Sequence, residues 1–175
     1  MMRHQRIFSG LWALAALGMA GGLAGCTTTP LPDGTELPTS ISFNSSICYG
    51  TCPAYKVTVR SDGSATWEGG QFVALKGVRQ FSVSDEDYRA FARTLAPIRP
   101  NGTRAIVAGS PDCGPAATDH HSTLIEWEDG TRKDRLDFYH GCHNPANAPI
   151  AEAVAAAPEH LPIDAFIGDP ATAKP

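Results

Sequence analysis

The sequence lacks the short motifs that commonly mark catalysis. It has no Gly-x-Ser-x-Gly nucleophile elbow and no glycine-rich phosphate loop. Ser110, Asp119 and His121 can be drawn as a triad, but a chain with many serines permits such combinations by chance. The three acids at residues 85–87 fit the first turn of a helix better than a catalytic pair. The sequence therefore favours a non-catalytic protein, without deciding the question.

Basic residues are also scarce. The chain has 14 Lys and Arg against 18 Asp and Glu, and two of the basic residues, Arg3 and Arg6, belong to the leader described next. Without them the formal charge is −6, with His taken as neutral. Nucleic-acid backbones are bound by basic surfaces, so nucleic acid is not expected as a partner.

Long apolar runs are confined to the N-terminus, where "IFSGLWALAALGMAGG" follows Arg3 and Arg6. This pattern is typical of a secretory signal and is too short for a membrane span. It ends in "LAGC", which resembles the lipobox of bacterial lipoproteins. The resemblance implies a signal peptide over residues 1–25 and a lipid on Cys26. Because Thr27 follows rather than Asp, it also implies anchorage in the outer membrane, on its periplasmic face. The alternative is an ordinary secretory signal that contains a cysteine.

Four cysteines remain after Cys26, an even number that favours two disulfides in an oxidising compartment. Of the three connectivities, we expect Cys48–Cys52, which are close in sequence, and Cys113–Cys142, which would link the loops flanking a hairpin. The segment "CYGTCP" also has the Cys-x-x-x-Cys-Pro spacing of Sco-type copper chaperones, and thiolates suit Cu(I). A dithiol redox site is disfavoured, because it usually has a shorter spacing at a helix N-terminus.

Residues 26–40 are rich in Thr and Pro and read as a tether, and residues 169–175 read as a loose tail. A single domain is predicted over residues 41–168. Alternating apolar residues predict strands at 41–47, 54–60, 65–69, 79–83, 122–128 and 131–139. Asp62-Gly63 and Asp129-Gly130 supply hairpin turns.

Two helices are expected between these strands. Ser84 is a candidate N-cap for the first, in which Tyr88, Phe91, Ala92 and Leu95 form one apolar stripe that ends at Pro97. The second covers residues 148–157, with Asn147 as its predicted cap. Residues 97–119 are rich in Gly and Pro and are predicted to be irregular. The order favours an α+β fold, an antiparallel sheet built from two hairpins with helices packed on one face.

The stretch from Cys48 to Gly69 carries a family resemblance. It reads Cys-Tyr-Gly-x-Cys-Pro-x-Tyr, then a strand, an Asp-Gly turn and Trp-x-Gly. It resembles family 6438 of bacterial domains of unknown function, with a looser similarity that extends over residues 41–168. The resemblance implies a secreted or lipid-anchored protein and carries no activity.

Four histidines cluster near the second cysteine pair: His120, His121, His140 and His143. A Cys113–Cys142 bond would bring their two loops together, with Asp112 and Asp119 as further oxygen ligands. Neutral imidazoles bind Zn or Cu, although no pair has the helical spacing of a zincin. The sequence therefore predicts a lipid-anchored periplasmic module that binds an unknown envelope protein or ligand without a cofactor. The alternative is a periplasmic protein that binds Zn or Cu through this His/Cys cluster.

Overall fold

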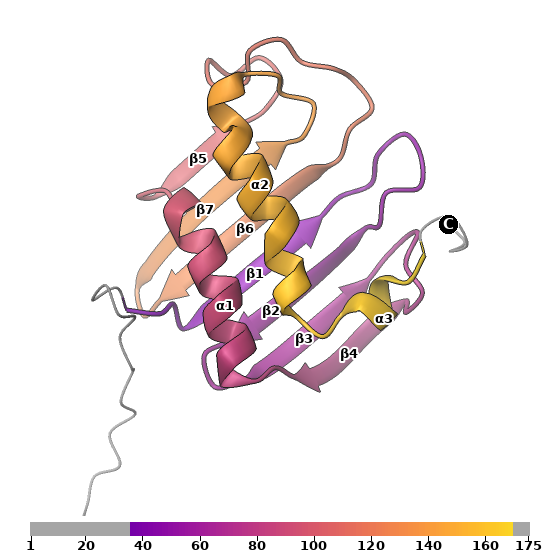
Figure 1. Ribbon diagram of the computed structural model, residues 1–175, viewed down its shortest axis with the longest axis vertical. Coiled ribbons are helices and arrows are strands. Elements are labelled where there is room, and N and C mark those ends of the chain that lie inside the picture. The colour runs from indigo at the N-terminus through magenta and orange to yellow at the C-terminus, as the bar shows by residue number, and fades with distance from the viewer. Residues whose placement is uncertain (1–35, 170–175) are drawn as a thin grey trace, which may run out of the picture.

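Seven strands and three α-helices form the part of the chain, residues 36–169, that the computed structural model describes (Figure 1). The strands are β1 (Ser40–Ser45), β2 (Tyr55–Arg60), β3 (Ser64–Gly69), β4 (Gly77–Ser82), β5 (Thr103–Ile106), β6 (Ser122–Asp129) and β7 (Arg132–Tyr139). The α-helices are α1 (Asp85–Leu95), α2 (Ala148–Ala156) and α3 (Asp164–Ile167). Three short 3-10 helices are η1 (Ala96–Ile98), η2 (Pro145–Asn147) and η3 (Ala157–His160). The predicted signal peptide, Cys26, most of the tether and most of the tail lie outside these residues.

The strands form one sheet in the order β4-β3-β2-β1-β6-β7-β5. Every neighbouring pair is antiparallel except β5 with β7, which is parallel. The predicted α+β class is therefore confirmed. The first strand in sequence becomes the central one, because β1 pairs with β2 on one side and β6 on the other.

The alternating residues give the sheet one apolar face. Ile41, Val57, Trp67, Ile125 and Leu136, one from each of five strands, are all fully buried. Figure 1 shows α1 and α2 lying across the same face of the sheet. The ring of Phe91 in α1 lies 6.5 Å from that of Phe43 in β1, and Phe166 in α3 lies 5.6 Å from Trp67 in β3.

The first helix begins as its sequence predicts. The Ser84 side chain accepts a hydrogen bond from the backbone N–H of Asp87, and the predicted apolar stripe is buried. The second helix also forms, and Asn147 occupies its N-cap position as predicted, but its side chain makes no capping hydrogen bond. The Asn147 side chain instead donates to the carbonyl oxygen of Asp112, and Asn144 caps the preceding η2 turn.

The prediction that residues 97–119 are irregular was wrong for residues 103–106. These form β5, which pairs with the outer side of β7. The Gly102 N–H donates to the buried Asp134 carboxylate, and the Arg135 N–H donates to the Gly102 carbonyl. A four-residue strand held by such distant partners has too short an alternation to be recognised from its own sequence.

Candidate functional site

A row of three side chains crosses the sheet at the end where β1 finishes. Ser45, the last residue of β1, lies opposite Tyr55 at the start of β2 and Thr123 near the start of β6. Each continues the inward-facing alternation of its strand, so the row faces the helices. Two of its members are small hydroxyl residues where a large apolar side chain would fill the core. This end of the sheet is therefore hollow.

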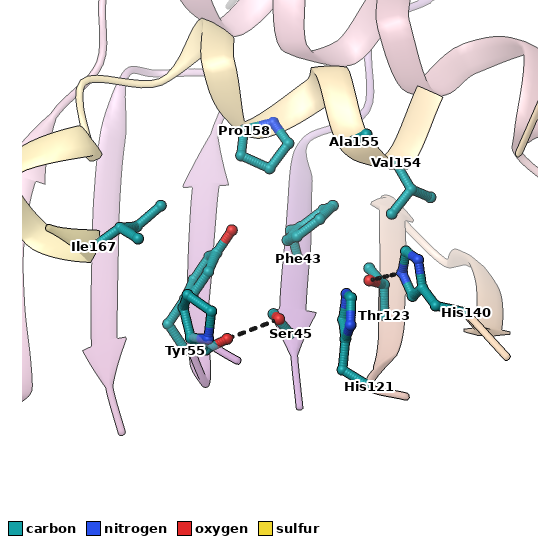
Figure 2. A pocket seen from close by; sticks show the side chains of 11 residues that line it. Phe43, Ser45, Tyr55, His121, Thr123, His140, Val154, Ala155, Pro158 and Ile167 are labelled. Carbon is teal, nitrogen blue, oxygen red and sulfur yellow. Dashed lines mark hydrogen bonds between the residues drawn. The ribbon is translucent and has the colours of Figure 1, made fainter. Parts of the chain in front are cut away.

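The hollow is a cavity of about 330 Å³ between the sheet and the C-terminal part of α2, here called the His pocket (Figure 2). It is lined by Phe43, Ser45, Pro53, Tyr55, His121, Thr123, His140, Val154, Ala155, Pro158 and Ile167. Its volume lies at the small end of known ligand sites, which span roughly 300–1,000 Å³. No Asp, Glu, Lys or Arg is among the lining residues.

Tyr55 provides a fixed polar group in the apolar wall. Its ring stacks on Trp67 at 4.8 Å and on Phe43 at 6.2 Å, so its orientation is determined by the core. Figure 2 shows the hydroxyl directed toward the helical side of the pocket, between Phe43 and Ile167. Within residues 36–169 the hydroxyl has no hydrogen-bond partner. Burial raises the pKa of Tyr55, so the phenol stays protonated and is available as a donor.

Two histidines form the opposite wall. The rings of His121 and His140 stack with centroids 3.9 Å apart and planes inclined by 19°. His140 Nε2 lies 2.9 Å from the hydroxyl oxygen of Thr123. Burial, with a smaller contribution from the neighbouring histidines, lowers the pKa of His140 to about 4. Burial and His120 also lower the pKa of His121. Both rings are therefore neutral at neutral pH.

The four predicted metal ligands do not form one group. His121 and His140 are adjacent, but imidazole lone pairs lie in the ring plane, so two nearly parallel stacked rings do not direct them at one ion. His120 is exposed and lies edge-on to Tyr139, and His143, next to Cys142 in sequence, is also exposed. Across residues 36–169 no three His, Cys, Asp or Glu side chains are arranged to hold a metal ion.

The predicted oxygen ligands also have other partners. The Asp112 carboxylate pairs with Arg104 at 2.9 Å, and that of Asp119 accepts a hydrogen bond from the Thr118 hydroxyl.

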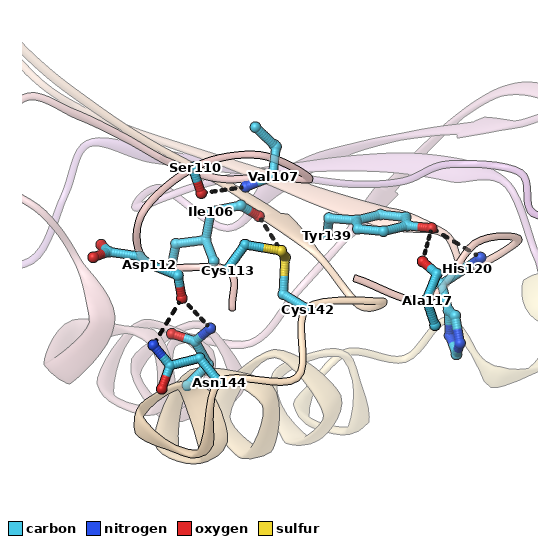
Figure 3. The surroundings of a disulfide bond; sticks show 11 residues. Ile106, Val107, Ser110, Asp112, Cys113, Ala117, His120, Tyr139, Cys142 and Asn144 are labelled. Atoms are coloured by element: carbon cyan, nitrogen blue, oxygen red, sulfur yellow. Dashed lines mark hydrogen bonds between the residues drawn. A yellow bond between two sulfur atoms is a disulfide. The ribbon is translucent and has the colours of Figure 1, made fainter. Parts of the chain in front are cut away.

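The cysteines pair as predicted, Cys48 with Cys52 and Cys113 with Cys142. In this disulfide form neither Cys48 nor Cys52 is a thiolate ligand for Cu(I). The second bond is buried, and around it the side-chain amides of Asn144 and Asn147 both donate to the Asp112 carbonyl (Figure 3). This bond fastens the loop before β6 to the loop before α2.

The first disulfide joins Cys48 and Cys52 within residues 46–54, here called the clasp loop, which reaches the rim of the His pocket at Pro53. Pro53 at its end lines the pocket, and the Ser45 hydroxyl donates to the Pro53 carbonyl. The Tyr49 N–H donates to the carbonyl of Asp119, two residues before His121. The loop is therefore held at both ends and in the middle. It nevertheless exposes two apolar side chains, Tyr49 at 89% and Ile47 at 55%.

The pocket has little of what catalysis requires. Thr123 and His140 are placed like a nucleophile and base, but Thr123 is only 1% exposed and a base with a pKa of about 4 is weak. No carboxylate lines the pocket to orient His140. Among the described residues no side-chain hydrogen bond joins Ser110, Asp119 and His121 as a triad would require; the Ser110 hydroxyl accepts from Val107 N–H and the Asp119 carboxylate from the Thr118 hydroxyl.

A second hollow of about 590 Å³ lies beside α2, between η1 and β5, and is lined largely by Pro and Ala with Arg99, Arg104 and Glu152. The Arg99 guanidinium forms ion pairs with the carboxylates of Asp129 and Asp134, each with an N–O distance of 2.6 Å. Both arginines that line this hollow are ion-paired, whereas the Tyr55 hydroxyl in the His pocket has no partner among the described residues.

Sequence reasoning selected His121 and His140 and missed Ser45, Tyr55 and Thr123 as parts of a site. The sequence did contain a signal for Ser45 and Thr123. In "ISFNS" and "TLIEW" the inward-facing series runs through large apolar residues and ends in Ser45 or Thr123. A hydroxyl at the end of an apolar alternation marks a position where the core stops being filled.

Comparison with known proteins identifies one family. The family model described as "Domain of unknown function (DUF6438)" matches residues 39–157. No curated protein and no solved structure gives a significant match. Among residues 36–169 no helix has the length and apolar character needed to cross a membrane.

Proposed function

This chain belongs to the DUF6438 family of domains of unknown function, and we propose that it is a lipid-anchored binding module of the bacterial envelope. The anchor is a lipid on Cys26, inserted in the outer membrane from the periplasmic side. The domain binds an envelope ligand or protein in the His pocket and catalyses no reaction. The lipobox-like "LAGC" and the two disulfides support the location, since disulfides persist in oxidising compartments.

The observation that carries the binding proposal is the unpaired Tyr55 hydroxyl in an apolar cavity. In the free protein the hydroxyl is open to solvent in the cavity. A ligand that fills the cavity would desolvate it, and a donor desolvated without a partner costs about 1–3 kcal/mol, so the site favours a ligand with an acceptor. The ring is held in place by stacking on Trp67 and Phe43, so the hydroxyl keeps one direction in the cavity. An apolar cavity with a few directed polar groups is the usual form of a ligand site.

The binding test uses the mature chain, exported with a non-lipoprotein signal peptide so that its disulfides form. Indole, benzyl alcohol and cyclohexanone are titrated while the ring signals of His121 and His140 are followed by NMR. We expect at least one compound to shift both rings. Ala155→Trp should block this response, because Ala155 is an exposed residue of α2 at the pocket. Ala148→Trp, at the exposed start of the same helix, is the control and should bind normally.

If none of these compounds shifts the rings, or if both tryptophan variants respond like the parent, the His pocket is not a binding site. The anchor is tested separately with Cys26→Ser in the full chain. This variant should lose detergent-phase partitioning, and unchanged partitioning would contradict the lipid anchor.

Zinc or copper binding is the second candidate, supported only by the proximity of His121 and His140. The stacking of these two rings argues against a shared ion, as does the lack of a third His, Cys, Asp or Glu grouped with them among residues 36–169. Elemental analysis of natively purified protein decides this. A stoichiometric metal that is lost in His140→Ala would replace the present proposal.

A further inference from the structure

We propose that the His pocket receives an uncharged apolar side chain from an extended segment of a partner protein, with the Tyr55 hydroxyl donating to a carbonyl of that segment. The exposed Ile47 and Tyr49 of the clasp loop cover the flanking residues of the segment. This inference rests on the proposed binding function and names its ligand class.

The requirement for an uncharged group follows from the pocket lining. No acidic or basic side chain faces the cavity, and its two imidazoles are neutral at neutral pH. A buried charge without a partner carries a large desolvation cost. A Lys or Glu side chain should therefore bind in the pocket less tightly than Leu or Phe.

The requirement for an acceptor follows from Tyr55. Its hydroxyl is a donor with no partner in the described part of the chain, and its ring is fixed by two aromatic neighbours. The carbonyl of a peptide bond satisfies such a donor. A pure hydrocarbon would leave it desolvated and unpaired.

The clasp loop favours a peptide over a lipid acyl chain. Pro53 of this loop lines the pocket, and the same loop exposes the apolar side chains of Ile47 and Tyr49, which do not line it. A ligand longer than one side chain could contact both. The disulfide and the hydrogen bond from Tyr49 N–H to Asp119 hold this surface in one conformation before binding, which reduces the entropic cost of association. Tyrosine is enriched among the residues that dominate protein interfaces.

The position of the pocket also favours a partner protein over a membrane lipid. The described chain enters at Glu36 and runs along β1 toward Ser45, so the pocket and the clasp loop lie at the opposite end of β1 from the N-terminal side. Figure 1 shows the loop after β1 at the far end of the sheet from the point where the chain enters. If the anchor is N-terminal, the site opens on the side of the domain away from the attachment.

The test uses four pools of capped pentapeptides with Ala, Gly, Ser and Val mixed at the outer positions and Leu, Phe, Lys or Glu at the centre. A fifth probe, mono-octanoylglycerol, represents the acyl chain. Each is titrated into the mature chain while NMR follows the rings of His121 and His140 and the amide of Tyr49. We expect the Leu or Phe pool to shift all three and to bind at least tenfold more tightly than the Lys and Glu pools.

Three variants locate the contacts. Tyr55→Phe should weaken the apolar pools about three- to tenfold, the effect of losing one hydrogen bond between neutral groups. Tyr49→Ala should weaken them while leaving the binding of indole or another small compound in the pocket unchanged. Val78→Ala is the matched control, because Val78 is 62% exposed but lies on β4 at the edge of the sheet, and it should have no effect.

The remaining outcomes overturn the inference. If the Lys and Glu pools bind as tightly as the Leu and Phe pools, the pocket does not require an uncharged side chain. If mono-octanoylglycerol binds and no peptide pool does, the ligand is a lipid. If no pool binds while a small compound still shifts the rings, the peptide class is wrong and the binding function stands. If neither peptides nor small compounds bind, the proposed function fails as well.

Discussion

Removing the two disulfides one at a time should cost very different amounts of stability. Cys113 and Cys142 are 29 residues apart in sequence, whereas Cys48 and Cys52 are 4 apart. In the chain-entropy description a cross-link restricts the unfolded chain more when it closes a longer loop. Loops of these lengths give about 3.6 kcal/mol for the long one and about 1.9 kcal/mol for the short one. Cys113 is also fully buried, so its replacement by alanine removes packing in addition.

The assay is urea unfolding at neutral pH of the double variants Cys113→Ala/Cys142→Ala and Cys48→Ala/Cys52→Ala. With a slope of roughly 2 kcal/mol/M, the unfolding midpoint should fall by about 1.8 M for the long loop and about 1 M for the short one. Hydrogen exchange adds a local readout, in which loss of the short bond should increase exchange at the Tyr49 amide. An equal or larger stability loss in the Cys48/Cys52 variant would refute the loop-entropy reasoning.

Three further predictions concern single residues. Folding holds the pKa of His140 at about 4, below the usual value of about 6.5 for an unfolded chain, so the unfolded state takes up the proton first and stability should fall as pH drops from about 6.5 to 4. His140→Gln should reduce this slope in pH-dependent urea unfolding, and an unchanged slope would contradict the assignment. Gly69→Ala should lower the free energy of unfolding by at least about 2 kcal/mol, because the alanine methyl group would overlap the Leu75 carbonyl oxygen, which accepts the Trp67 indole N–H. A urea midpoint equal to that of the wild type would contradict this close contact. Thr123→Val should cost about 1 kcal/mol and change the ring nitrogen shifts of His140, and unaltered shifts would mean that the hydroxyl is not its partner.

Much of the fold was readable from local patterns. The alternation in "YKVTVR", the Asp62-Gly63 turn and the Ser84 cap act over a few residues, and the structure contains each of them. The pairing of the cysteines was also predictable from their spacing and their positions around the second hairpin. Conversely, β5 depends on Asp134 and Arg135, about 30 residues away, and the central place of β1 depends on two partners.

The sequence by itself identified only some of the residues that form the His pocket and its rim. It marked His121 and His140 as candidates and placed the Cys48–Cys52 loop before a strand. Tertiary structure decided that the two imidazoles stack against each other and that Tyr55, Ser45 and Thr123 share one row beside them. The physical reason is that side-chain alternation is a local property of each strand. The cavity instead arises from the register between strands far apart in sequence, which no single segment encodes.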